Sequence, residues 1–154
     1  MSCVIPLSVG DEIERHLVAE HPRESCGLLV GRDQPGVRWI AYAVPADNQD
    51  EEPGKRYEIS PEAFLDVEKH ARSRSLDVVG FYHSHPDGVP APSARDAATA
   101  WPHYTYLIVG VARGGSVRMA AWRLGDDGFT AETIRWSDVA LGPRVFQTRD
   151  GKRT

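Results

Sequence analysis

Residues 78–86 read Val78-Val79-Gly80-Phe81-Tyr82-His83-Ser84-His85-Pro86, an apolar run that ends in two histidines and a proline. The apolar and β-branched side chains predict a buried strand over residues 76–83. Side chains alternate along a strand, so His83 and His85 point to the same face. Two imidazoles on one face, at the end of a rigid strand, are able to share one metal ion.

A carboxylate follows at a spacing that suits the same ion. After a proline-rich connection, Ser93 opens a short helix predicted to reach about Trp101, and Asp96 lies on its first turn. Two histidines and one carboxylate form a catalytic zinc set in which the fourth position is left for water. Each feature also has a structural interpretation, because a strand histidine beside a turn is commonly structural and Ser93 with Asp96 is an ordinary capping box. The two interpretations of Asp96 are compatible, since a cap can hold the aspartate in place.

Helix and strand signals outside this motif predict one α+β domain. Ser8 is a good N-cap with Asp11 three residues later, and the apolar spacing predicts a helix over residues 9–20. Ser60-Pro61 starts a second helix that runs to about Ser73. The other predicted strands are 26–30, 37–44, 104–111, 117–124 and 129–136, with a longer loop between the first two and turns at Gly114-Gly115 and Asp126-Asp127-Gly128. Helices segregated from a hairpin-linked sheet give the α+β class.

Residues 78–86, with Ser93 and Asp96, closely resemble the signature of the JAMM (MPN-plus) zinc metalloproteases: H-x-H, seven residues, S, two residues, D. The family's upstream E-x-x-G-hydrophobic-G segment is matched by Glu24-Ser25-Cys26-Gly27-Leu28-Leu29-Val30-Gly31. The resemblance covers roughly residues 8–136. It implies the cytidine-deaminase-like MPN/JAMM fold, a single mixed, largely antiparallel sheet packed with helices. We expect a catalytic domain over residues 1–142 and a flexible basic tail over residues 143–154.

The resemblance implies a role for five residues. His83, His85 and Asp96 match the ligands of one zinc ion per chain. Glu24 matches the glutamate that holds and deprotonates the metal-bound water, and Ser93 matches the serine that helps to stabilise the tetrahedral oxyanion. All five are present, so a zinc metallopeptidase is expected, and a non-catalytic MPN-type interaction scaffold is the alternative. Without the resemblance, Glu24 would be interpreted as a surface carboxylate after a helix.

The loop after the histidines indicates a class of substrate. It reads Asp87-Gly88-Val89-Pro90-Ala91-Pro92-Ser93, which differs from the Gly- and aromatic-containing loop of the eukaryotic isopeptidases. It is similar to that of stand-alone prokaryotic members, some of which process ubiquitin-like sulfur carrier proteins. The resemblance therefore implies cleavage after the C-terminal Gly-Gly of a ubiquitin-like or sulfur carrier protein. Loops 45–57 and 86–92 are expected to wall a narrow groove, which favours an extended peptide with glycine at the scissile bond.

Composition and net charge limit the classes of protein and of partner that remain possible. The chain has 154 residues, 41% apolar and 26% charged, as in one globular domain. The net charge of −4 lacks the basic footprint of a nucleic-acid binder, which also disfavours a DNA-repair-associated relative with a similar H-x-H…D motif. We expect a reduced, cytoplasmic protein without a membrane partner, because Cys3 and Cys26 are the only cysteines and no signal peptide or membrane-spanning run is present. Cys26 is expected to be a small buried hydrophobe rather than a nucleophile. The sequence does not decide whether the protein forms a homodimer.

Overall fold

Seven strands and three helices are present in the residues that the computed structural model describes, 1–49 and 57–139. In chain order they are β1 (Ser2–Pro6), α1 (Leu7–Glu20), β2 (Cys26–Gln34), β3 (Val37–Ala46), α2 (Pro61–Ser73), β4 (Asp77–His85), α3 (Ala94–Thr99), β5 (Thr105–Val111), β6 (Val117–Gly125) and β7 (Gly128–Ser137). The α+β class is therefore confirmed. The predicted tail at 143–154 lies outside the described residues. Among the described helices, none has the length and apolar character needed to cross a membrane.

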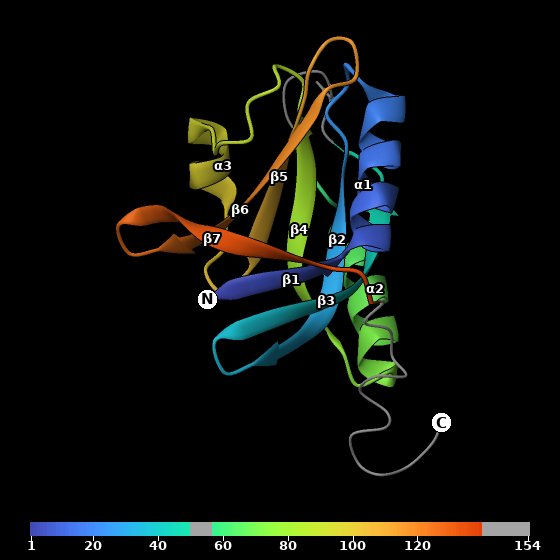
Figure 1. Ribbon diagram of the computed structural model, residues 1–154. Coiled ribbons are helices and arrows are strands. Elements are labelled where there is room, and N and C mark those ends of the chain that lie inside the picture. The colour runs from blue at the N-terminus through green and yellow to red at the C-terminus, as the bar shows by residue number, and fades with distance from the viewer. Residues whose placement is uncertain (50–56, 140–154) are drawn as a thin grey trace.

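The strands form one mixed sheet that closes on itself in the order β1-β3-β2-β4-β5-β6-β7. Three ladders are parallel (β1–β3, β1–β7 and β4–β5) and four are antiparallel. The mixed, largely antiparallel sheet is confirmed, but its closure was not predicted. The closing strand is β1, whose apolar run is too short to be recognised as a strand from sequence. Figure 1 shows β7 beside β1, and Val4 of β1 pairs with both Trp39 of β3 and Arg135 of β7.

The β2–β3 hairpin is longer than predicted. Its ladder continues to the pair Gln34 and Val37, so only Pro35 and Gly36 form the turn, and Gly36 has a φ of 75°. The predicted longer loop is wrong because the end of the hairpin is polar and exposed, so an apolar pattern stops before the hydrogen bonding does. β4 also runs beyond its predicted end, to His85, which pairs with Gly110 of β5, because its last residues are polar although His83 and Ser84 are buried.

Helix boundaries are set partly by local signals and partly by the sheet. The predicted cap of α2 is confirmed, because Ser60 Oγ accepts a hydrogen bond from Ala63 N at 3.1 Å. The predicted Ser8 cap of α1 is wrong, since β1 leads directly into the helix and Pro6 is the N-cap with no side-chain hydrogen bond. Helix α3 ends at Thr99, before the predicted Trp101.

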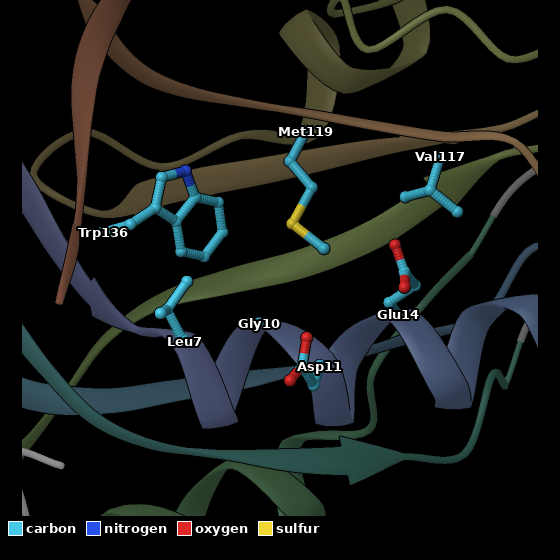
Figure 2. Close-up of a pocket in the computed structure, with 7 residues that line it drawn as sticks. All are labelled: Leu7, Gly10, Asp11, Glu14, Val117, Met119 and Trp136. Carbon is cyan, nitrogen blue, oxygen red and sulfur yellow. The ribbon is translucent and has the colours of Figure 1, made fainter. Parts of the chain in front are cut away.

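The helices pack against the sheet through two apolar cores. Ile13 and Leu17 of α1 belong to one core, and Ala71 of α2 belongs to the other. Figure 2 shows α1 facing β6 and β7 across a groove that Gly10 and Trp136 line from opposite sides. A Cβ on Gly10 would lie 2.6 Å from Cζ3 of Trp136, so a side chain here would displace the indole ring that lies against the helix.

Candidate metal centre

The candidate metal centre lies where β4 ends. β4 pairs with β2 on one side and with β5 on the other, which fixes the two histidines at its end. The chain then turns back, because Gly88 N donates to the His85 carbonyl at 3.1 Å and Gly88 adopts a φ of 83°. The first turn of α3, with the buried Asp96, is thereby brought beside the end of β4.

Three side chains singled out from the sequence converge here. The Nε2 atoms of His83 and His85 are 3.1 Å apart. Asp96 Oδ1 lies 3.2 Å from Nε2 of His83, and Asp96 Oδ2 lies 3.1 Å from Nε2 of His85. One ligand atom from each residue lies within 4.8 Å of the other two, and in residues 1–49 and 57–139 this is the only such group of three or more.

A backbone contact sets the tautomer of His85. Its Nδ1 lies 3.0 Å from the carbonyl oxygen of Val89. A carbonyl only accepts, so Nδ1 carries the proton and, in the neutral ring, Nε2 presents its lone pair to the cluster. Loop residue Val89 therefore orients a ring that lies on β4, as carbonyl partners of metal-ligating histidines do.

His83 is fully buried and is held by an aromatic neighbour. Its relative exposure is 0%, and the ring of Tyr57 stacks on it with centroids 4.3 Å apart and planes at 23°. Its Nδ1 has no hydrogen-bond partner among the described residues. The polar contacts of His83 are therefore made through Nε2, the atom that faces His85 and Asp96.

For each residue of this cluster, burial shifts the pKa in one direction and the hydrogen bonds within the cluster shift it in the other. Burial lowers the pKa of His83, and the Asp96 carboxylate only partly offsets this. Burial also acts to lower the pKa of His85, but the hydrogen bond and charge of Asp96 outweigh it and the pKa is raised. Burial acts to raise the pKa of Asp96, but hydrogen bonds from both histidines hold that pKa well below its usual range. Asp96 is therefore ionised and His83 neutral near pH 7, the protonation states that metal binding requires of them.

The donor set fits a divalent metal ion. Two imidazole nitrogens face each other at 3.1 Å, and only one of them can carry a proton directed at the other. A cation placed between them would satisfy both lone pairs and the carboxylate together. Two histidines with one carboxylate, in a site that leaves a coordination position open, are typical of catalytic zinc.

Glu24 lies beside this cluster rather than on the surface. Glu24 precedes β2 and is 7% exposed. The expectation from local sequence alone, that it is a surface carboxylate, is therefore wrong. The two residues that follow Glu24 join the end of β4, because Ser84 N donates to the Ser25 carbonyl and Cys26 pairs with His83. Glu24 is not a member of the three-residue group.

Ser93 caps α3 as predicted. Its Oγ accepts from Asp96 N at 3.1 Å, and Asp96 Oδ2 accepts from Ser93 N at 2.8 Å. This reciprocal capping box fixes the rotamer of the aspartate. Ser93 is exposed and uses only the oxygen of its hydroxyl in the cap, so the hydroxyl proton is free for another acceptor.

Sequence reasoning missed two residues near the cluster. Tyr57, which stacks on His83, lies in a segment predicted only as a loop. Asn48 donates from Nδ2 to the carbonyl oxygen of Glu24 at 2.9 Å. Neither contact has a local signal, because each joins residues far apart in the chain.

Cys26 is the small buried hydrophobe that the sequence predicted. It is a free cysteine with 0% exposure, adjacent in the ladder to His83. Burial raises its pKa to about 12, so the thiol is neutral and unsuited to nucleophilic attack.

An apolar pocket of about 670 Å³ adjoins the cluster. Tyr57 lines this pocket and also stacks on His83, and Arg95, the neighbour of Asp96, lines it as well. Its wall is largely aromatic, including Phe64 of α2 and Tyr106 of β5. A large ligand that reaches the cluster thus has an apolar surface beside it.

Comparison with known proteins identifies the family of this chain. Residues 6–125 match the family model described as prokaryotic homologs of the JAB domain. A desampylase from Haloferax volcanii is 43% identical over 88 residues, which are 56% of this chain and 62% of that protein. A probable TtuB-protein conjugate cleaving protease from Thermus thermophilus is 33% identical over 106 residues, 69% of this chain and 68% of that protein. The chain therefore matches slightly less than two thirds of the Haloferax relative.

A solved structure has the same fold. The solution structure of a protein from Desulfitobacterium hafniense superposes with a TM-score of 0.81 at 29% sequence identity. The match covers 92% of this chain and 96% of that one. The likeness therefore extends over nearly all of both chains.

Proposed function

This chain belongs to the family of prokaryotic JAB-domain homologues, and we propose that it is a zinc-dependent metallopeptidase. The proposed reaction is hydrolysis of the amide bond after the C-terminal Gly-Gly of a ubiquitin-like or sulfur carrier protein. The observation that carries the proposal is the convergence of His83, His85 and Asp96 within 4.8 Å, with the buried Glu24 just before the backbone contact between Ser25 and Ser84.

The three converging residues would hold one zinc ion per chain. When bound, zinc makes water acidic enough to supply hydroxide near neutral pH and polarises the carbonyl under attack. The protein's part is to keep the three ligand atoms in place, and the Val89 carbonyl and the Ser93 cap do this for His85 and Asp96.

Glu24 and Ser93 supply the proton chemistry and the charge stabilisation. The Glu24 carboxylate takes a proton from the attacking water and later delivers it to the leaving amine, which contributes about 10²–10⁴-fold in general acid–base catalysis. The Ser93 hydroxyl, whose proton is not used in the cap, donates to the oxyanion of the tetrahedral intermediate.

A protein substrate is supported by two features. The loop 86–92 borders the ligand cluster and, with the described part of the loop 45–57, would admit an extended peptide to it. The aromatic pocket lined by Tyr57, which stacks on His83, would receive apolar side chains of the carrier. The relative from Thermus is named for cleaving conjugates of TtuB with proteins, which is the same type of reaction.

The rival proposal is a non-catalytic MPN-type scaffold. A scaffold has no physical need to keep three converging ligand residues together with a buried glutamate, and this chain has His83, His85, Asp96 and Glu24. Metal content separates the two proposals, because only the enzyme requires zinc.

A narrow groove at the metal centre is expected to require glycine next to the scissile bond of the substrate. A ubiquitin-like carrier with a short extension after Gly-Gly, such as a single cysteine, is expected to lose that extension when incubated with the zinc-loaded enzyme. A carrier whose penultimate glycine is replaced by valine is expected to stay intact, because the branched Cβ would clash with the groove walls. Mass spectrometry of the carrier measures both.

Chelator-treated enzyme is the control for that experiment. Cleavage of the glycine carrier that persists without zinc contradicts the metallopeptidase proposal. Equal cleavage rates for the glycine and valine carriers contradict the proposed narrow groove. They do not contradict zinc-dependent hydrolysis.

Ser93→Ala is expected to retain zinc and to lose less activity than a change of Glu24. Removing one oxyanion donor lowers kcat by about 10²-fold, and loss of the cap costs about 1 kcal/mol of stability. Zinc content, kcat per folded protein and thermal unfolding are the measurements. Unchanged kcat would show that Ser93 only caps α3.

A further inference from the structure

The peptide bond between Glu24 and Ser25 is held from both sides by side chains. Its carbonyl oxygen accepts from Asn48 Nδ2 at 2.9 Å, and its N–H donates to Ser84 Oγ at 3.0 Å. A peptide group is planar, so two fixed contacts on its C=O and its N–H fix the orientation of the whole plane. The Cα of Glu24 lies in this plane, so the two contacts restrain the point from which its side chain leaves the backbone.

Ser84 makes this contact from between the two candidate ligands. Its backbone N also donates to the Ser25 carbonyl at 3.0 Å, so residues 25 and 84 are joined twice. Alternation along β4 directs the Ser84 side chain away from the face that carries His83 and His85. Ser84 is 1% exposed, so its hydroxyl makes its hydrogen bonds within the protein and not with solvent.

Asn48 makes its contact from the chain that follows β3. Its Oδ1 accepts from Glu58 N at 2.9 Å, and Gln49 N donates to the Glu58 carbonyl at 2.7 Å. With its oxygen facing an N–H and its nitrogen facing a carbonyl, the amide has one consistent orientation. Glu58, the neighbour of Tyr57, is thus tied through Asn48 to the backbone of Glu24.

We propose that Ser84 and Asn48 are positioning residues, which aim the Glu24 carboxylate at the attacking water by clamping the Glu24–Ser25 peptide. The proposal rests on the proposed function, in which Glu24 is the base. Neither residue touches the substrate or the metal. Their effect passes through Glu24, and a misplacement of about 1 Å in such a group costs about 10²-fold in rate.

Ser84→Ala removes the hydroxyl and keeps the strand. We expect kcat to fall by about 10–100-fold, with KM and zinc content unchanged. Ser84→Thr keeps an acceptor oxygen and is expected to restore most of kcat. Asn48→Ala releases the other side of the peptide and is expected to act in the same direction as Ser84→Ala. Ser25→Ala is the matched control, because the Ser25 hydroxyl has no hydrogen-bond partner among the described residues, and this variant is expected to match the parent.

Two readouts separate positioning from a general structural role. The Ser25 amide proton, followed by NMR in the zinc-loaded protein, is expected to exchange about tenfold faster in Ser84→Ala than in the parent. In a Glu24→Gln background, Ser84→Ala is expected to cause no further loss of kcat, because residues that act through one group are not additive.

Either of two results overturns the proposal: unchanged exchange of the Ser25 amide in Ser84→Ala, or a full further loss of kcat in the Glu24→Gln background. Loss of zinc from Ser84→Ala also overturns it, since the residue would then support the ligands. If the parent enzyme cleaves no carrier, the proposed function fails, and the amide exchange still decides whether the clamp exists.

Discussion

Glu24→Gln is expected to keep the zinc and the fold and to lower kcat by about 10²–10⁴-fold. The substitution preserves the size of the side chain and its hydrogen-bonding capacity, but an amide cannot take a proton from water. Zinc content stays at the parent level because Glu24 is not among the three converging ligand residues. The measurements are metal analysis and the rate of carrier cleavage.

The control for this variant is a carboxylate elsewhere on the chain. Glu62 is exposed on the first turn of α2, and Glu62→Gln is expected to leave kcat and zinc content unchanged. A fully active Glu24→Gln enzyme contradicts the assignment of Glu24 as the base. Loss of zinc from the variant contradicts it as well, because Glu24 would then be a ligand.

Asp96→Asn and His85→Ala are expected to lose both zinc and activity. Each change removes a ligand from a site with three protein ligands, so the remaining two cannot hold the ion against dialysis. Asp96→Asn retains a side-chain oxygen that can accept from Ser93 N, so the cap of α3 survives. Loss of metal from this variant therefore reports on the ligand and not on the helix.

Elemental analysis after dialysis, with circular dichroism for the fold, measures this prediction. His70→Ala is the matched control, because His70 is exposed on α2 and lies outside the ligand group. Full zinc retention in both Asp96→Asn and His85→Ala would show that the ion is held elsewhere.

Local signals in the sequence predicted much of the fold. Ser60-Pro61 starts α2 because a hydroxyl cap and an N1 proline act on adjacent backbone groups. Strand alternation placed His83 and His85 on one face, and the Ser93-x-x-Asp96 spacing gave the capping box, as the structure has them. The role of these residues as zinc ligands remains a prediction.

Contacts between distant segments could not be predicted in the same way. The start of α1 at Leu7 follows from the attachment of β1, which overrides the Ser8 signal. The burial of Glu24 and its contact with Asn48 depend on how β2 and the chain after β3 lie together.

The sequence by itself determined features whose geometry depends on near neighbours: the caps of α2 and α3, the turns after β5 and β6, the paired histidines and the spacing to Asp96. Only the tertiary structure decided that the sheet closes through β1, that Asp96 meets the histidines at 3.1–3.2 Å, and that Asn48, Tyr57 and Ser84 surround the site. The physical reason is that periodicity and capping are short-range effects, whereas strand pairing and side-chain packing join opposite ends of the chain and leave no repeating pattern in either segment.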